Sequence, residues 1–246
     1  MGVYWLIVGF ACTDIVMQDL PPPSAAQNLL MIIHGSGDNA EDWPEEMNTA
    51  MTRSLPNTDT WDIWTYDWEE YAESKLSASK SGYELGEQIA YRLLEDPYAY
   101  DHVHLIAHSV GCFVSYGIAE HLFRQESTIT VHSTHLDPFT GHGMVRWQFG
   151  ERNFGQYSDF SESYYNKDDS VPSTNGALQF AHNFDVTALR DTSYVEDDFH
   201  WWPIEYYIRS IEDETMLGYA HSDQFLVEGA QAMQEWYPRG EETVLQ

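Results

Sequence analysis

Residues 102–112 read HVHLIAHSVGC, an apolar strand pattern that breaks at Ser109 and continues into a helical pattern. A strand that turns sharply into a helix at a serine brings the residues two before and two after it against neighbouring backbone, so only small side chains fit there. Ala107 and Gly111 meet this requirement, although glycine is more usual at the first position. Ser115, the other serine with a glycine two residues later, has the bulky Phe113 before it. The stretch therefore predicts a nucleophile elbow at Ser109.

The composition describes an acidic chain of one domain. Its 246 residues are 43% hydrophobic, which is enough for a core of ordinary size. Forty acidic residues against eleven basic ones give a formal charge of −29. This charge argues against a nucleic-acid partner and against binding to an anionic membrane surface, and it favours neutral substrates. Such an acidic surface, with only three lysines, is also compatible with a saline habitat.

Strand and helix patterns alternate along the chain. Continuous apolar or alternating runs predict strands at residues 28–33, 61–68, 102–108, 128–136 and 178–189, and helical spacing marks residues 82–95 and 204–211. This order predicts an α/β fold with a mostly parallel, doubly wound sheet and helices on both faces. We expect a single domain over residues 28–246. The polar stretch 141–176 is expected to be an irregular insertion bordering the site.

The N-terminal segment, residues 1–27, allows two interpretations. An apolar run at residues 3–11 ends at Cys12, which resembles a lipoprotein signal, but it lacks a preceding basic residue and could equally be a first strand. The first reading predicts a secreted protein, or one lipid-anchored outside the cytoplasm through Cys12. The second predicts a cytoplasmic one. Two cysteines are too few for a disulfide framework, and no apolar segment reaches the length of a membrane-spanning helix.

An activated serine needs two oxyanion donors and a base that an acid orients. Ser36, in a His-Gly-Ser turn after a buried strand, and Val110, directly after Ser109, are placed to supply backbone N–H groups. In an α/β fold with this kind of elbow the base follows the nucleophile and the acid along the chain. This order leaves His200 and His221 as candidate bases, each shortly before a predicted helix. Asp137 and Asp191, each following a predicted strand, are the candidate acids.

The remaining acidic clusters, Glu41–Asp42, Glu45–Glu46 and Asp168–Asp169, lack the spacing of a calcium-binding loop and are expected to be solvated surface. We therefore expect no metal ion and no organic cofactor at the site.

Several dispersed matches resemble the pancreatic-type lipases and their phospholipase and yolk-protein relatives. The likeness covers roughly residues 29–211, and its motifs are Ile33-His34-Gly35, Tyr66-Asp67-Trp68, the elbow, Leu136-Asp137-Pro138, Phe184-Asp185-Val186 and the segment from His200 to Ile211. The resemblance implies an α/β-hydrolase fold, a triad of Ser109, Asp137 and His200, and a small neutral ester or lipid substrate. The disulfides and the separate C-terminal β-sandwich domain of that family are absent from this sequence.

The function that this reading implies is a serine carboxylic-ester hydrolase acting through an acyl-enzyme. Two alternatives stay open: a non-catalytic lipid-binding or storage protein of the same fold, and another serine hydrolase chemistry such as an amidase, peptidase or acyltransferase. Only eight residues, 192–199, separate Asp191 from His200. This segment is too short for the long lid of the lipases, so we expect activity on soluble rather than emulsified esters.

Overall fold

A seven-stranded sheet forms the centre of the protein. The computed structural model describes residues 15–55, 57–143, 145–213 and 215–246. The strands run in the order β2-β1-β3-β4-β5-β6-β7, and every neighbouring pair is parallel. They are β1 (Asn28–Ile33), β2 (Trp61–Tyr66), β3 (His102–His108), β4 (Thr130–Leu136), β5 (Phe160–Tyr165), β6 (His182–Asp185) and β7 (Glu242–Val244). The predicted parallel, doubly wound sheet is confirmed.

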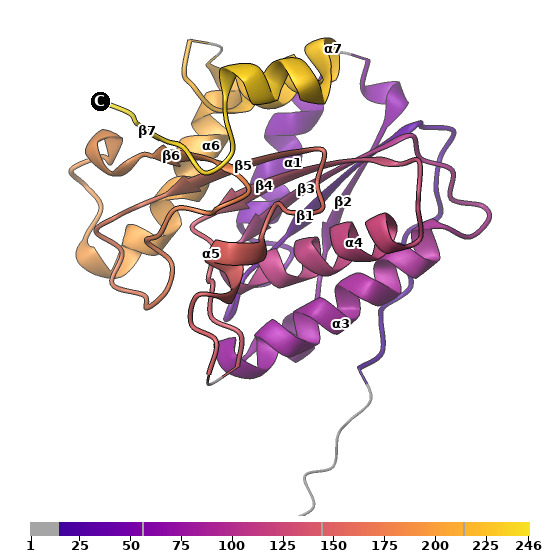
Figure 1. Ribbon diagram of the computed structural model, residues 1–246, viewed down its shortest axis with the longest axis horizontal. Coiled ribbons are helices and arrows are strands. Elements are labelled where there is room, and N and C mark those ends of the chain that lie inside the picture. Colours follow the sequence, from indigo (N-terminus) through magenta and orange to yellow (C-terminus); the bar gives the residue numbers. More distant parts are fainter. Residues whose placement is uncertain (1–14, 56, 144, 214) are drawn as a thin grey trace, which may run out of the picture.

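Helices cover both faces of this sheet (Figure 1). One face carries α3 (Lys75–Leu93) and α4 (Cys112–Arg124), and the other carries α1 (Trp43–Ser54), α6 (Trp202–Glu212) and α7 (Tyr219–Trp236). Two short helices, α2 (Glu69–Ala72) and α5 (Phe149–Asn153), and the 3-10 turns η1 (Thr58–Thr60), η2 (Ser109–Gly111), η3 (Thr187–Leu189) and η4 (Glu196–Trp201) lie in the connections. The arrangement brings the loops that follow the parallel strands to one edge of the sheet.

Strand β1 shows how the sequence fills both layers. Leu29, Met31 and Ile33 belong to the apolar cluster shared with α3 and α4, whereas Leu30 and Ile32 belong to the cluster shared with α1 and α6. All five side chains are fully buried. Each contributes about 1.5–3 kcal/mol relative to an exposed position. A continuous apolar run is therefore what a strand covered on both faces requires.

The chief difference from the sequence prediction lies in residues 141–176. They are not irregular throughout, because they contain α5 and the interior strand β5. Strand β5 reads FSESYY, and its middle residues are polar although every residue of the strand is buried. Glu162 explains this, because its carboxylate accepts hydrogen bonds from Thr134 at 2.8 Å, Ser222 at 2.5 Å and Tyr164 at 2.9 Å. Its side chain is satisfied inside the protein, so polarity at this position does not indicate a loop.

Smaller differences concern the ends of elements. The predicted strand at 178–189 is confined to β6, because Thr187–Leu189 turns into η3. The predicted helix at 82–95 begins earlier, at Lys75, and the short strand β7 was not expected. The two readings of the apolar run at residues 3–11 and Cys12 fall outside the described residues.

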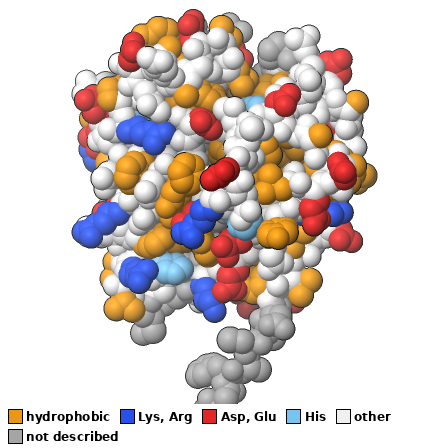
Figure 2. All heavy atoms as spheres, turned by 45° about the vertical axis from the view of Figure 1, so that its right-hand side comes forward, with side chains coloured by type: hydrophobic (Ala, Val, Ile, Leu, Met, Phe, Trp, Pro, Cys, Tyr) orange, Lys and Arg blue, Asp and Glu red, His pale blue; other side chains and the backbone are white. Residues whose placement is uncertain are grey.

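The surface carries its acidic side chains as scattered groups. On the face shown in Figure 2 they lie among polar and hydrophobic side chains, and most of the visible basic side chains lie on the left half of the view. Within the described part of the chain, no helix is both long and apolar enough to span a bilayer.

Candidate active site

Ser109 lies at the end of β3, where the chain turns into η2 and then α4. Its φ is +52°, in the left-handed region that non-glycine residues rarely adopt, and its side chain is almost wholly buried. A Cβ at Gly111 would lie 2.4 Å from the His34 carbonyl oxygen, so only glycine fits there without displacing backbone. The predicted elbow geometry, with its requirement for a small residue two positions after the serine, is confirmed.

His200 approaches Ser109 from η4, directly before α6. Its Nε2 lies 2.8 Å from the Ser109 Oγ, and its Nδ1 lies 2.8 Å from Asp137 Oδ2. Asp137 and Ser109 lie 63 and 91 positions before His200 along the chain, yet the fold brings the three residues together. A serine hydroxyl bonded to an imidazole that is itself bonded to a carboxylate is the arrangement that activates a serine nucleophile.

Asp137 follows β4 and is fully buried, with φ at +43°. The backbone N–H of Asn166 donates to its Oδ1 at 2.9 Å, which leaves Oδ2 for His200. Burial raises the pKa of Asp137 to about 7; the hydrogen bond from His200 acts in the opposite direction, and the charge of Asp169 adds to the rise.

A second carboxylate, which the sequence analysis placed on the solvated surface, also contacts His200. Asp169 Oδ2 lies 2.9 Å from the same Nδ1, and only 1% of the Asp169 side chain is exposed. The expectation of a solvated Asp168–Asp169 pair is therefore wrong for Asp169. The signal that could have found it is its position four residues after β5, a strand that the polar sequence concealed.

The carboxylates and His200 shift one another's pKa values. Although burial opposes the change, hydrogen bonds from His200 and Thr174 hold the pKa of Asp169 well below its usual range. Burial likewise opposes the charged form of His200, but the hydrogen bonds to Asp137 and Asp169 raise its pKa to about 9. The imidazolium of His200 is therefore strongly stabilised at this position.

The loop that carries His200 is fixed by its neighbours. His108, the residue before Ser109, donates from Nε2 to the His200 carbonyl oxygen at 3.1 Å. The side-chain amide of Asn166 donates to the Phe199 carbonyl oxygen at 3.0 Å, and the Arg190 guanidinium lies 3.7 Å from the centroid of the Phe199 ring. These contacts fix the backbone of His200 and of Phe199, the residue before it.

The turn after β1 lies directly against the serine. A Cβ at Gly35 would be 3.0 Å from the Ser109 Cβ, so Ser36 follows a residue in contact with the elbow. His34 supports this turn from inside: its Nε2 accepts the Trp68 N–H at 3.1 Å, while its Nδ1 lies 2.9 Å from the Gly35 carbonyl oxygen. Asp67 Oδ1 also lies 3.2 Å from Nε2, so both ring nitrogens of His34 are engaged inside the turn and its role is structural.

The alternative site residues lie elsewhere. Asp191 is exposed, and its Oδ1 accepts the backbone N–H of Ser193 at 2.9 Å. His221 lies in the first turn of α7. It is buried there, and its ring stacks on Phe184 with the planes 13° apart. The hydrogen bonds to Ser109 and to the two carboxylates are made by His200.

Among the residues that the structure describes, two groups of side chains have the residue types that bind metal ions. In the first, His104, His132 and Glu162, the two imidazole rings stack with centroids 3.8 Å apart and planes within 5°. A cation bound to both Nε2 atoms would lie far out of both ring planes, which disfavours coordination. The second group is Asp137, Asp169 and His200, in which the histidine faces the carboxylates through Nδ1 while Nε2 faces Ser109. We interpret both as hydrogen-bonded protein clusters.

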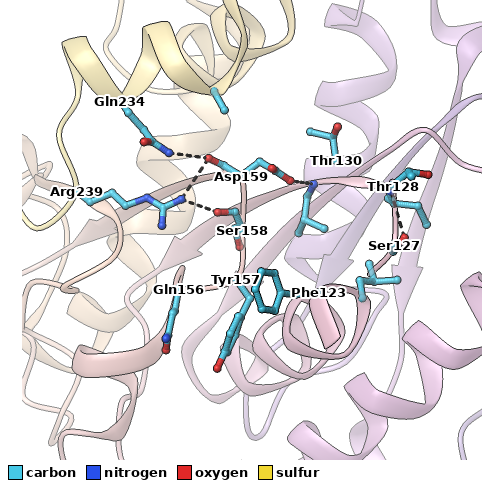
Figure 3. Close-up of a pocket in the computed structure, with 14 residues that line it drawn as sticks. Phe123, Ser127, Thr128, Thr130, Gln156, Tyr157, Ser158, Asp159, Gln234 and Arg239 are labelled. Atoms are coloured by element: carbon cyan, nitrogen blue, oxygen red, sulfur yellow. Dashed lines mark hydrogen bonds between the residues drawn. The ribbon is translucent and has the colours of Figure 1, made fainter. Parts of the chain in front are cut away.

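A polar cavity lies at the opposite edge of the sheet. Its volume is about 330 Å³, and its lining includes Thr130 and Val131 at the start of β4, Asp159 just before β5, and Arg239. Figure 3 shows Arg239 reaching the carbonyl oxygens of Ser158 and Asp159. Because Ser109 follows the carboxyl end of β3, this cavity is remote from the elbow.

Comparison with known proteins decides the family. A sequence model described as the alpha/beta hydrolase family matches residues 30–244. The chain belongs to the alpha/beta hydrolase family. This model describes the alpha/beta hydrolases in general, so the match does not show that the chain is one of the pancreatic-type lipases. No curated protein matches this hydrolase.

One of the similar solved structures supports the fold. A putative cell surface hydrolase from Lactobacillus plantarum is 11% identical, with a TM-score of 0.51, and the alignment covers 85% of this chain and 98% of that one. The RedJ thioesterase of prodiginine biosynthesis from Streptomyces coelicolor is 19% identical, with a TM-score of 0.34 over 50% of this chain and 44% of that one. A laboratory-evolved potato epoxide hydrolase is 16% identical, with a TM-score of 0.31 over 44% and 33%. This alpha/beta hydrolase thus spans less than half of the last two structures.

Proposed function

We propose that the protein is a serine carboxylic-ester hydrolase that forms an acyl-enzyme at Ser109. The observation that supports this most strongly is the chain of hydrogen bonds from the Ser109 Oγ through the His200 imidazole to buried carboxylate. An isolated serine hydroxyl is a weak nucleophile, and this arrangement is the one that removes its proton during attack.

The reaction follows from these positions. His200 Nε2 takes the Ser109 proton as Oγ attacks the ester carbonyl, and the carboxylates stabilise the imidazolium that forms. The amides of Ser36 and Val110 are the proposed donors to the oxyanion of the tetrahedral intermediate. His200 then gives its proton to the departing alcohol, which leaves the acyl group on Ser109. A water molecule, deprotonated by His200, attacks this acyl-enzyme, releases the acid and restores the serine.

The substrate that fits best is a soluble, neutral ester of short to medium acyl length. The net charge of −29 disfavours anionic substrates, and the eight residues from 192 to 199 are too few for a long interfacial lid. The loop before α5 exposes the apolar side chains of Val145 and Trp147, but Arg146 and Arg152 interrupt this surface. A continuous apolar face of the kind that binds lipid droplets is therefore not formed there.

A substrate panel tests this proposal. Nitrophenyl esters of increasing acyl length, with matched thioester and anilide substrates, should show highest kcat/KM for the short and medium esters. Turnover should not rise when substrate passes its solubility limit. Ser109→Ala is the blank, and it should leave only background hydrolysis.

A clear preference for the anilide or thioester would replace the ester assignment with another serine hydrolase chemistry. No turnover of any substrate by wild-type protein would favour the non-catalytic binding alternative. A strong jump in rate on emulsified long-chain triglyceride would contradict the argument from the short segment before His200.

A further inference from the structure

His200 Nδ1 faces two carboxylates rather than one. Asp137 Oδ2 is 2.8 Å away and Asp169 Oδ2 is 2.9 Å away, so neither has a clear advantage in distance. All three atoms lie within 4.8 Å of one another and are buried. One acceptor is enough to orient a histidine. The second carboxylate therefore requires an explanation.

Each carboxylate accepts hydrogen bonds from its own set of donors. Asp137 is fixed by the N–H of Asn166 at 2.9 Å. Asp169 is fixed by the N–H of Val171 at 3.0 Å and by the hydroxyl of Thr174. Asp137 follows β4 and Asp169 follows β5, so they also reach the site from different strands. Loss of either side chain thus leaves the other anchored beside Nδ1.

We propose that Asp137 and Asp169 form a divided orienting acid, in which either carboxylate alone holds His200 in the tautomer that accepts the Ser109 proton. This inference rests on the proposed serine-dependent hydrolysis and concerns positioning residues, since neither carboxylate contacts the reacting atoms. The proton on Nδ1 is shared between two acceptors. When one is removed, the same proton is donated fully to the remaining one.

The two members of the pair differ in their response to pH. Burial raises the pKa of Asp137 to about 7, whereas the pKa of Asp169 stays well below its usual range, because the His200 and Thr174 hydrogen bonds outweigh its burial. Asp137 therefore gains a proton as pH falls through neutrality, while Asp169 stays ionised. Because the charge of Asp169 contributes to the raised pKa of Asp137, removing Asp169 lowers that pKa and favours an ionised Asp137 beside His200.

Alanine variants separate this arrangement from a conventional single acid. Alanine is chosen because an asparagine amide could donate to Nδ1 and favour the inactive tautomer. Asp137→Ala and Asp169→Ala should each lower kcat on a short nitrophenyl ester by less than about 30-fold, whereas the double variant should lose about 10⁴-fold, the loss found when a triad has no orienting acid.

Asp191→Ala is the matched control, because it removes an exposed carboxylate whose Oδ1 accepts the Ser193 N–H at 2.9 Å, away from His200. It should keep near wild-type kcat. The downfield resonance of the His200 Nδ1 proton should persist in both single alanine variants and disappear in the double variant. Serine versions of the same substitutions provide a second set where alanine lowers the yield of folded protein, as judged by circular dichroism.

The proposal is overturned if one single variant loses as much kcat as the double, because that residue is then the sole acid. It is also overturned if the double loss equals the product of the two single losses. Hydrolysis that persists in Ser109→Ala would instead defeat the proposed function itself. The two failures are thus distinguishable within one set of assays.

Discussion

His200 and His221 are both buried histidines close to a helix start, but their surroundings differ. His200 bonds Ser109 through Nε2, whereas His221 stacks on Phe184 and packs edge-on against Tyr237. We therefore predict that His200→Ala lowers kcat by roughly 10⁴-fold or more, as loss of a triad base does in serine hydrolases. His221→Ala should change kcat less than about 3-fold, and it should lower the melting temperature because it leaves a cavity.

The check is steady-state ester hydrolysis together with a thermal melt of each variant. A reversed ranking, with His221→Ala inactive and His200→Ala active, would mean that the assignment of the base is wrong. The melt ensures that an unfolded variant is not mistaken for an inactive one.

The sequence pattern predicted Ser109 as the nucleophile and left two candidate acids and two candidate bases. The resemblance to the pancreatic-type lipases implied Asp137 and His200, and the structure brings these two and Ser109 into one hydrogen-bonded chain. Each carries a local signal, namely small neighbours, a strand end followed by proline, and a loop before a helix. Asp169 carries no such signal in the sequence, because its burial depends on Thr174 and on strand β5. A side chain satisfied by distant tertiary contacts cannot be recognised from its local pattern.

Helices α3 and α4, which pack beneath the elbow, approach closely through two glycines. A Cβ at Gly86 would lie 2.3 Å from the Val114 carbonyl oxygen, and a Cβ at Gly117 would lie 2.4 Å from the Tyr83 carbonyl oxygen. Because backbone cannot give way as a side chain can, we predict that Gly86→Ala lowers the free energy of unfolding by about 2 kcal/mol or more. Urea denaturation measures this change.

Gly82→Ala is the control within the same helix. Its Cβ would meet only side chains, the nearest being Val114 Cγ2 at 3.2 Å, and alanine also favours helix formation. We expect a change within about 1 kcal/mol. An equal loss of stability in both variants would show that the Gly86 contact does not determine how closely α3 and α4 pack.

Among the elements, those with continuous apolar runs or clear helical spacing were predicted, including β1, β3 and α6. Strand β5 was missed because buried Ser161, Glu162 and Ser163 break the apolar pattern of the strand. Strand β7 has only three residues, two of them exposed, and so leaves little pattern to detect. Both strands are defined by their pairing partners in the sheet, which the local sequence does not contain.

For the whole molecule, the order of strand and helix patterns was enough to predict the fold class, because parallel strands joined by helices allow few topologies. The family match over residues 30–244 agrees with this prediction. The net charge is a property of the same scale. Its acidic groups are dispersed over the face in Figure 2, and a field of this sign repels anionic ligands from the entire surface. The preference for a neutral substrate thus rests on the molecule as a whole rather than on one residue.

Covalent labelling with a fluorophosphonate tests whether Ser109 is the nucleophile of an ester hydrolase. Intact-mass analysis of wild-type protein should show a single adduct, peptide mapping should place it on Ser109, and ester turnover should fall in step with labelling. Ser109→Ala should fold normally and gain no adduct. Labelling at another residue, or near wild-type ester turnover by Ser109→Ala, would show that Ser109 is not the nucleophile.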